Sequence, residues 1–209
     1  MSELVLARHG ETEWNVEGVF RGRIDLELNQ TGIKQAELLA GYLSEEIEAV
    51  YSSPLKRATK TAEAVAHRHN LRVEVSPGLI DCDFGQWQGL SLEEVKNKYG
   101  KLYRQWAESP QLVKIPGGES LDGVRERALK VVNGVIAKHR GRVALVSHRV
   151  VNKVLICALL GLDNSHFWNI RQDVGGTTIF SHQDGRFVLT RHNDTSYLRL
   201  LKKAELGDF

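Results

Sequence analysis

The chain has 209 residues, of which 42% are hydrophobic and 26% are charged. This composition is typical of a globular protein that buries a core, and the length predicts one domain over residues 1–209. Lysine and arginine number 28 against 26 acidic residues, so the net charge of +2 gives no bulk electrostatic reason to bind nucleic acid or a membrane surface.

The N-terminus and the cysteines indicate a compartment. The first apolar run stops at Ala7, too early for a signal peptide, and no later run is long enough to cross a bilayer. Cys82 and Cys157 are too few for a disulfide framework and lack the spacing of metal ligands. We therefore expect a cytoplasmic protein without nucleic-acid or membrane partners.

Strand and helix patterns alternate in the first part of the chain. Residues 3–8 are an apolar run that predicts a strand, and residues 31–46 carry apolar side chains at helical spacing, with Thr31 as the expected N-cap. The elements expected next are a strand over 48–54, a helix over 54–70 that has Pro54 in its first turn, and a strand over 72–75. This alternation is typical of βαβ units in a parallel sheet.

The second part resumes the alternation after an irregular segment. Residues 84–118 are rich in aromatic side chains and are broken by glycine and proline, which predicts an insertion that covers the pocket. The elements expected after it are a helix over 119–139, a strand over 141–150, a helix over 151–161 and a β-hairpin over 177–194 that turns on Asp184-Gly185. We predict an α/β fold: a single three-layer αβα domain with a largely parallel sheet and a short helical insertion over the active site. The exposed edge of the hairpin could support a homodimer.

Polar residues stand where the predicted strands end. They are Arg8-His9, Ser52-Ser53 and Ser147-His148, with Arg57 one turn into the helix that follows the second strand. In open α/β sheets the ligand crevice lies outside the carboxyl ends of the strands, so these side chains are expected to meet.

The shared chemistry of these residues predicts an oxyanion pocket. Arginines offer planar forks of donors that suit phosphate oxygens, and the first turns of the following helices add backbone N–H groups. A histidine beside such guanidinium groups has its charged form disfavoured, so its pKa falls below the ordinary value of about 6.5. It would be neutral and nucleophilic at neutral pH.

Five segments resemble one family. "LARHGETEWN", "QTGIKQAELLAGYL", "YSSPLKRATKTAEA", "DFGQWQG" and the pair "PGGES" and "LVSH" are similar, in this order, to the histidine phosphatase superfamily, which contains phosphoglycerate mutases and many small phosphatases. The resemblance implies that His9 attacks phosphorus and forms a phosphohistidine, that Arg8 and Arg57 bind the phosphoryl oxygens, and that His148 completes the pocket. It also implies substrate contacts from Asn15, Arg21 and Gly22.

The leaving group needs a general acid, because an expelled alkoxide is a poor leaving group. The family usually places a glutamate four residues before the glycine that is Gly85 here, and this chain has Asp81 at that position. Its carboxyl lies closer to the backbone than that of glutamate by one bond, roughly 1.5 Å. Asp83 is the rival candidate.

Two further departures add cations near the expected pocket. Arg149 stands where the family commonly has glycine, and Arg21 where small phosphatases often have glutamine. If either faces the site, the substrate carries a second anionic group, such as a carboxylate. The aromatic residues Trp87, Tyr99, Tyr103 and Trp106 could equally line a pocket for the leaving group or pack the insertion onto the domain.

The sequence thus predicts a phosphomonoesterase that hydrolyses a small phosphorylated metabolite without a cofactor, because it carries no metal-ligand pattern and no nucleotide-binding glycine loop. A mutase that needs a bisphosphorylated cofactor is the alternative within the family, although the short segment before the long helix favours a phosphatase. A non-catalytic phosphate sensor is the alternative outside it. The substrate stays open among phosphoserine, a ribazole phosphate, a sugar phosphate and a phosphorylated glycolytic acid.

Overall fold

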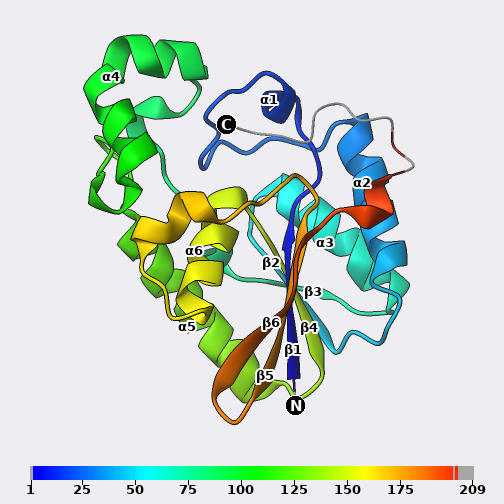
Figure 1. The fold of residues 1–209 in the computed structure, drawn as a ribbon. Helices are drawn as coiled ribbons and strands as arrows, with labels where there is room; N and C mark the ends of the chain where they lie inside the picture. The colour runs from blue at the N-terminus through cyan, green and yellow to red at the C-terminus, as the bar shows by residue number, and fades with distance from the viewer. Residues whose placement is uncertain (1, 200, 202–209) are drawn as a thin grey trace.

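The computed structural model describes residues 2–199 and 201 (Figure 1). Its centre is a six-stranded sheet of order β3-β2-β4-β1-β5-β6. The strands are β1 (Ser2–Arg8), β2 (Ala49–Ser52), β3 (Val73–Val75), β4 (Arg142–Ser147), β5 (Thr177–Gln183) and β6 (Arg186–Asp194). The first four run parallel, β5 is antiparallel to β1, and β6 is antiparallel to β5. The predicted α/β class with a largely parallel sheet is confirmed.

Helices cover both faces of this sheet (Figure 1). They are α2 (Gln30–Tyr42) and α3 (Lys56–Arg68) on one face, and α5 (Leu121–Lys138) and α6 (Arg149–Leu159) on the other. Successive strand side chains point to opposite faces, so β1 serves both layers. Leu4 and Leu6 belong to the core cluster under α5 and α6, whereas Val5 and Ala7 belong to the cluster under α2 and α3.

The irregular segment of the sequence lies outside these three layers. It contains α4 (Leu92–Glu108) between two short 3₁₀ turns, η2 (Gly85–Trp87) and η3 (Pro110–Leu112). Together with the one-turn helix α1 (Glu13–Val16), α4 lies toward the end of the molecule at which β1 finishes (Figure 1). In the part of the chain that the structure describes, no helix combines the length and the apolar character needed to cross a membrane.

Local turn and cap chemistry sets the element boundaries. The predicted hairpin is confirmed, with Asp184 and Gly185 at φ 52° and 73° in the left-handed region that such a turn requires. The expected N-cap of the first long helix was wrong: the cap is Asn29, not Thr31, and its side chain accepts a hydrogen bond of 2.8 Å from Gly32 N. Asn29 also donates to Glu11 Oε1 at 2.8 Å, a contact to a distant segment that helical periodicity does not reveal.

Candidate active site

Arg8 and His9 lie at the end of β1, where the strand is paired on both sides. Backbone bonds hold both residues, from Arg8 N to Gly176 O at 3.1 Å and from His9 N to Ser147 O at 3.0 Å. Both side chains are buried, with exposed fractions of 0% and 1%. Arg8 Nη1 donates to Gln172 O at 2.9 Å, which fixes the direction of the guanidinium.

The ring of His9 is held in one orientation. Its Nδ1 lies 2.6 Å from Gly10 O, and because a carbonyl oxygen only accepts, Nδ1 carries the proton. Nε2 of the neutral ring therefore keeps its lone pair. Gly10 is required here because a Cβ at this position would meet Gly32 O at 2.4 Å, so a larger residue would separate β1 from the start of α2.

Arg57 brings a second guanidinium from the start of α3. The side chain is fully buried, and it donates to Ile24 O at 2.9 Å through Nη1 and to Gly22 O at 2.8 Å through Nη2. Burial lowers its pKa to about 10, and the nearby Asp81 carboxylate opposes this shift. Arg57 is therefore still a cation at neutral pH.

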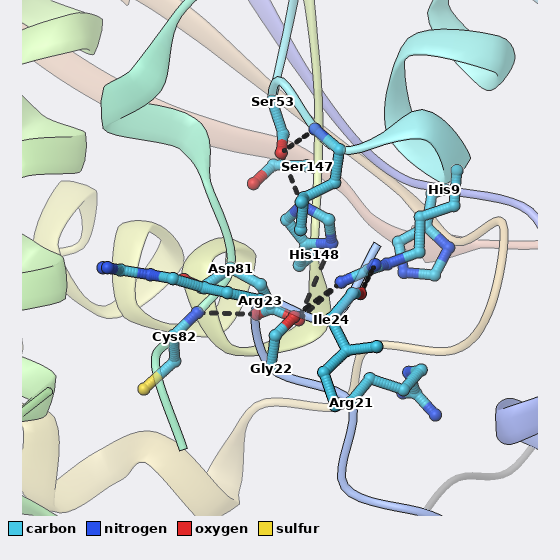
Figure 2. Close-up of polar contacts among 12 residues, drawn as sticks. His9, Arg21, Gly22, Arg23, Ile24, Ser53, Asp81, Cys82, Ser147 and His148 are labelled. Atoms are coloured by element: carbon cyan, nitrogen blue, oxygen red, sulfur yellow. Dashed lines mark hydrogen bonds and ion pairs between the residues drawn. The ribbon is translucent and has the colours of Figure 1, made fainter. Parts of the chain in front are cut away.

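His148 follows β4 and is the N-cap residue of α6. Its ring centroid lies 5.1 Å from that of His9. Figure 2 shows the ring between Ser53 and Asp81, with Nε2 at 2.7 Å from Ser53 Oγ and Nδ1 at 3.7 Å from Asp81 Oδ2. Arg8, His9, Arg57 and His148, here called the strand-end cluster, are thus brought together as the sequence predicted.

Both histidines of the strand-end cluster are neutral at neutral pH. Burial lowers the pKa of His9 well below its usual range, and Arg57 and Arg8 lower it further. The pKa of His148 falls for the same reasons, with burial as the largest. The sequence predicted a lowered pKa from the neighbouring guanidinium groups alone. The pKa is lowered as predicted, but burial contributes more to the shift than the guanidinium groups do.

Asp81 faces the strand-end cluster. Its Oδ2 lies 3.4 Å from Arg57 Nη2, and its Oδ1 accepts a hydrogen bond of 2.9 Å from Cys82 N (Figure 2). Burial raises the pKa of the Asp81 carboxyl above its ordinary value, against the opposing charges of Arg57 and Arg21. This carboxyl therefore retains a proton at a higher pH than an exposed aspartate does.

Asp83, the rival candidate, is engaged elsewhere. Its Oδ1 accepts a hydrogen bond of 2.8 Å from Gly85 N, and its Oδ2 lies 3.6 Å from Arg23 Nη1. Neither contact involves the strand-end cluster. The geometry therefore favours Asp81 as the carboxyl that acts beside the histidines.

A partly buried ion pair holds the backbone of Asp81. Arg127 of α5 binds Glu119 through two bonds, Nε to Oε1 at 2.8 Å and Nη2 to Oε2 at 2.9 Å. The same guanidinium donates to Gly78 O at 2.8 Å and to Asp81 O at 3.2 Å. The "PGGES" segment thus places its glutamate behind the carboxyl, a role that the sequence did not reveal.

The three predicted substrate contacts have different surroundings. Asn15 Oδ1 accepts from Thr12 N and Thr12 Oγ1, both at 2.9 Å, and so caps α1. Arg21 Nη1 donates to Trp14 O at 2.9 Å. Gly22 has φ 52°, in the left-handed region that favours glycine, and a Cβ there would meet Gln88 Oε1 at 2.1 Å; its carbonyl accepts from Arg57.

An aromatic pocket opens beside Asp81. Arg21, Gly22 and Arg149 line it together with Asp81, so both extra cations face the site. The rest of the lining is apolar, namely Val19, Phe20, Phe84, Tyr103, Trp106, Val150, Phe167 and Trp168. Tyr103 and Trp106 of α4 line the pocket, but Trp106 also belongs to the core cluster that contains the fully buried Trp87. Tyr99 packs against that cluster, so the aromatic residues of the insertion serve both the pocket and the packing.

Phe167 and Trp168 are lining residues that the sequence analysis missed. They lie in η4 (Asn164–Asn169), a short turn after α6, and no motif or period marks them. Arg149 Cζ lies 5.5 Å from the centroid of the Trp168 ring, and Trp168 Nε1 donates to Trp106 O at 2.7 Å. The one feature of the sequence that could have indicated their role in the pocket is that these two large aromatic residues are adjacent.

Comparisons with known proteins agree with this geometry. The model of the histidine phosphatase superfamily (branch 1) matches residues 4–195. The chain belongs to this superfamily. It is 40% identical over 200 residues to phosphoserine phosphatase 1 of Hydrogenobacter thermophilus, with 95% of each chain covered. As a member of the histidine phosphatase superfamily it is a phosphatase, and the family chemistry proceeds through a phosphohistidine.

Solved structures of this superfamily share the fold. A phosphoserine phosphatase from Entamoeba histolytica in complex with 3-phosphoglyceric acid is 30% identical, has a TM-score of 0.85 and covers 95% of this chain and 100% of its own. Bacillus stearothermophilus YhfR is also 30% identical, with a TM-score of 0.90 and the same coverage. Among the residues that our structure describes, no three His, Cys, Asp or Glu side chains gather as a metal site requires.

Proposed function

We propose that this protein hydrolyses small phosphomonoesters that carry a second anionic group, with phosphoserine as the first candidate, and that His9 is the nucleophile. The observation that carries the proposal is the neutral His9 ring, whose Nδ1 is held by Gly10 O so that Nε2 keeps its lone pair, near the buried guanidinium groups of Arg8 and Arg57. The names of the relatives, phosphoserine phosphatases from two organisms, support the substrate.

In the first step, Nε2 of His9 attacks phosphorus in line with the ester oxygen. The N–P bond forms as the P–O bond breaks, and Asp81 gives its proton to the departing alcohol. Arg8, Arg57 and His148 stabilise the charge on the three phosphoryl oxygens. Burial raises the pKa of Asp81, which favours the protonated carboxyl that this step needs.

In the second step, water attacks the phosphohistidine. Asp81, now ionised, takes a proton from that water while the N–P bond breaks, and phosphate leaves with its charge held by the same arginines. The histidine returns to its neutral form. The cycle consumes one water and returns every protein group to its starting state.

The aromatic pocket receives the alcohol that leaves. It adjoins Asp81, and it presents guanidinium groups from Arg21 and Arg149 against an apolar wall. A carboxylate on the leaving group would pair with these cations, and guanidinium is well suited to a bidentate bond with it. Gly22 shapes the loop that Arg57 holds, and Asn15 caps the one-turn helix α1 that precedes this loop.

The test is a panel of phosphomonoesters incubated with the purified protein in EDTA, with free phosphate and isomerised product both measured. The panel contains phosphoserine, 3-phosphoglycerate, a sugar phosphate and a ribazole phosphate. Ethyl phosphate is the control, because it has no anionic group besides the phosphate. Phosphate release from phosphoserine, faster than from ethyl phosphate, supports the proposal. Isomerisation that depends on added 2,3-bisphosphoglycerate would make the protein a mutase, and binding without either product would make it a sensor.

We also propose a cytoplasmic location and a homodimer. Cys82 and Cys157 are buried free thiols, which suits a reducing compartment. The strand β6 is at the edge of the sheet, and Val188 on it is 56% exposed. Sedimentation of the full chain, compared with a Val188→Lys variant, tests the dimer: a shift to monomer in the variant supports it, and a monomeric parent protein contradicts it.

A further inference from the structure

Ser53 is a buried hydroxyl that touches a member of the strand-end cluster. It follows β2, has an exposed fraction of 0%, and places Oγ 2.7 Å from His148 Nε2 (Figure 2). Leu55 N, at the entry to α3, donates to the same Oγ at 3.3 Å. Ser53 therefore has two partners with different hydrogen-bonding capacities.

The capacities of these partners fix the direction of the Ser53–His148 bond. A backbone N–H only donates, so Leu55 N uses a lone pair of the hydroxyl, and the single hydroxyl proton needs an acceptor. A buried hydroxyl that fails to donate costs free energy. Among the described residues, His148 Nε2 is the neighbour of Ser53 Oγ that can accept this proton. Ser53 then donates and His148 Nε2 accepts.

This direction determines the tautomer of His148. A neutral imidazole has one N–H, so a ring whose Nε2 accepts has its proton on Nδ1. That nitrogen is on the side of Asp81, at 3.7 Å from its Oδ2, and makes no hydrogen bond to the described residues. An N–H donor is thus directed toward the space beside His9, where a phosphoryl oxygen would lie.

We propose that Ser53 is a positioning residue that keeps His148 in the tautomer whose Nδ1–H donates to the transferring phosphoryl group. The opposite tautomer would present a lone pair to an anionic oxygen and would weaken its binding in the transition state. The consequence for catalysis depends on the proposed function, whereas the tautomer itself does not.

The first test reads the tautomer directly. The ¹⁵N shifts of the His148 ring, assigned in the full chain by comparison with a His148→Gln variant, separate a protonated nitrogen from an unprotonated one at neutral pH. Protonated Nδ1 and unprotonated Nε2 are expected. The reverse pattern in the parent protein would overturn the proposal, and this measurement needs neither activity nor a folded Ser53 variant.

The second test is kinetic, with matched variants. Loss of a whole oxyanion donor costs about 10²–10³ in kcat. The Ser53→Ala variant loses the hydrogen bond to His148 but retains the imidazole ring, so kcat should fall by about tenfold with little change in KM. Ser53→Thr keeps a hydroxyl and should recover most of this loss. Ser52→Ala is the control, because that neighbouring buried serine donates to Ser53 O at 2.9 Å, whereas the hydrogen bond to His148 Nε2 comes from Ser53.

The outcomes separate the two proposals. Equal losses in Ser52→Ala and Ser53→Ala would assign Ser53 a packing role and contradict the inference. An altered His148 tautomer in Ser53→Ala, without loss of kcat, would contradict its catalytic part. A parent protein that hydrolyses no phosphomonoester but shows the expected tautomer would refute the proposed function and leave the assignment of the His148 proton intact.

Discussion

The strand-end cluster and the aromatic pocket share Asp81 as a neighbour, yet they are built differently. The four side chains of the cluster are at most 1% exposed. Backbone bonds at the end of β1 hold Arg8 and His9, and two backbone carbonyls hold the Arg57 guanidinium. The pocket is lined from separate loops and helices, and its Trp168 is 36% exposed. The buried cluster suits the phosphoryl group that every candidate substrate shares, while the pocket suits the part that differs among substrates.

The largest effect is expected where the cluster loses its nucleophile. His9→Ala removes the atom that accepts the phosphoryl group, and phosphate release should fall by roughly 10⁴-fold or more for every substrate. The loss should be the same for every substrate, because the strand-end cluster acts on the phosphoryl group that all of them share. The exposed His67→Ala is the control and should keep full activity. A residual rate that varies strongly with the substrate would break the division between the two regions.

Asp81→Asn should cause the second-largest loss of activity, because Asp81 lies beside both the strand-end cluster and the aromatic pocket. Loss of the general acid should lower kcat by about 10²–10⁴ for alkyl esters and much less for p-nitrophenyl phosphate, which expels its alcohol without a proton. The Asp81 carboxyl must be protonated in the first step, so the rate should fall as the pH rises through its raised pKa. The variant should lack this limb of the pH profile. A limb that persists in Asp81→Asn would assign the acid to another group, and Asp83→Asn would then be tested.

Arg149→Gln should change selectivity more than rate. A charge-assisted bond to a carboxylate is worth about 1.5–3 kcal/mol, so kcat/KM for phosphoserine should fall by about tenfold or more while ethyl phosphate changes little. Arg21→Gln should do the same, although its bond to Trp14 O also anchors the loop. The exposed Arg186→Gln controls for net charge. Equal losses for both substrates would show that these cations serve the cluster and not the pocket.

The smallest effect on activity is expected at the Glu119–Arg127 ion pair, which holds the backbone of Asp81. Glu119→Gln weakens the pair with Arg127, and should lower kcat a few-fold and the Tm by about 2–4 °C. Burial would raise the pKa of Glu119, but the bond to Arg127 and the nearby positive charges together hold this pKa below its ordinary value. The stability that the ion pair contributes is therefore present at higher pH and is lost as the pH falls through the depressed pKa. The Tm difference from the parent should therefore vanish in acid. The exposed Glu37→Gln should leave both quantities unchanged, and a difference that grows in acid would contradict the assignment.

The sequence predicts the cluster better than the pocket for a physical reason. Arg8, His9 and His148 end strands whose apolar runs are visible in the sequence, and parallel strands bring their carboxyl ends to one edge. The contacts of Phe167 and Trp168 with Arg149 and Trp106 depend on how η4 packs against α4 and α6, and no local pattern records such packing. The same holds for Arg127, which binds Glu119 and the backbone of Asp81.

The central claim is that His9 carries the phosphoryl group. Rapid acid-free quenching of the full chain with ³²P-labelled phosphoserine, followed by digestion and peptide mapping, tests it most directly. We predict an acid-labile, base-stable label on the peptide that contains His9, formed at least as fast as turnover and absent from His9→Ala. A label on another residue, or phosphate release that persists in His9→Ala without any labelled protein, would contradict the account.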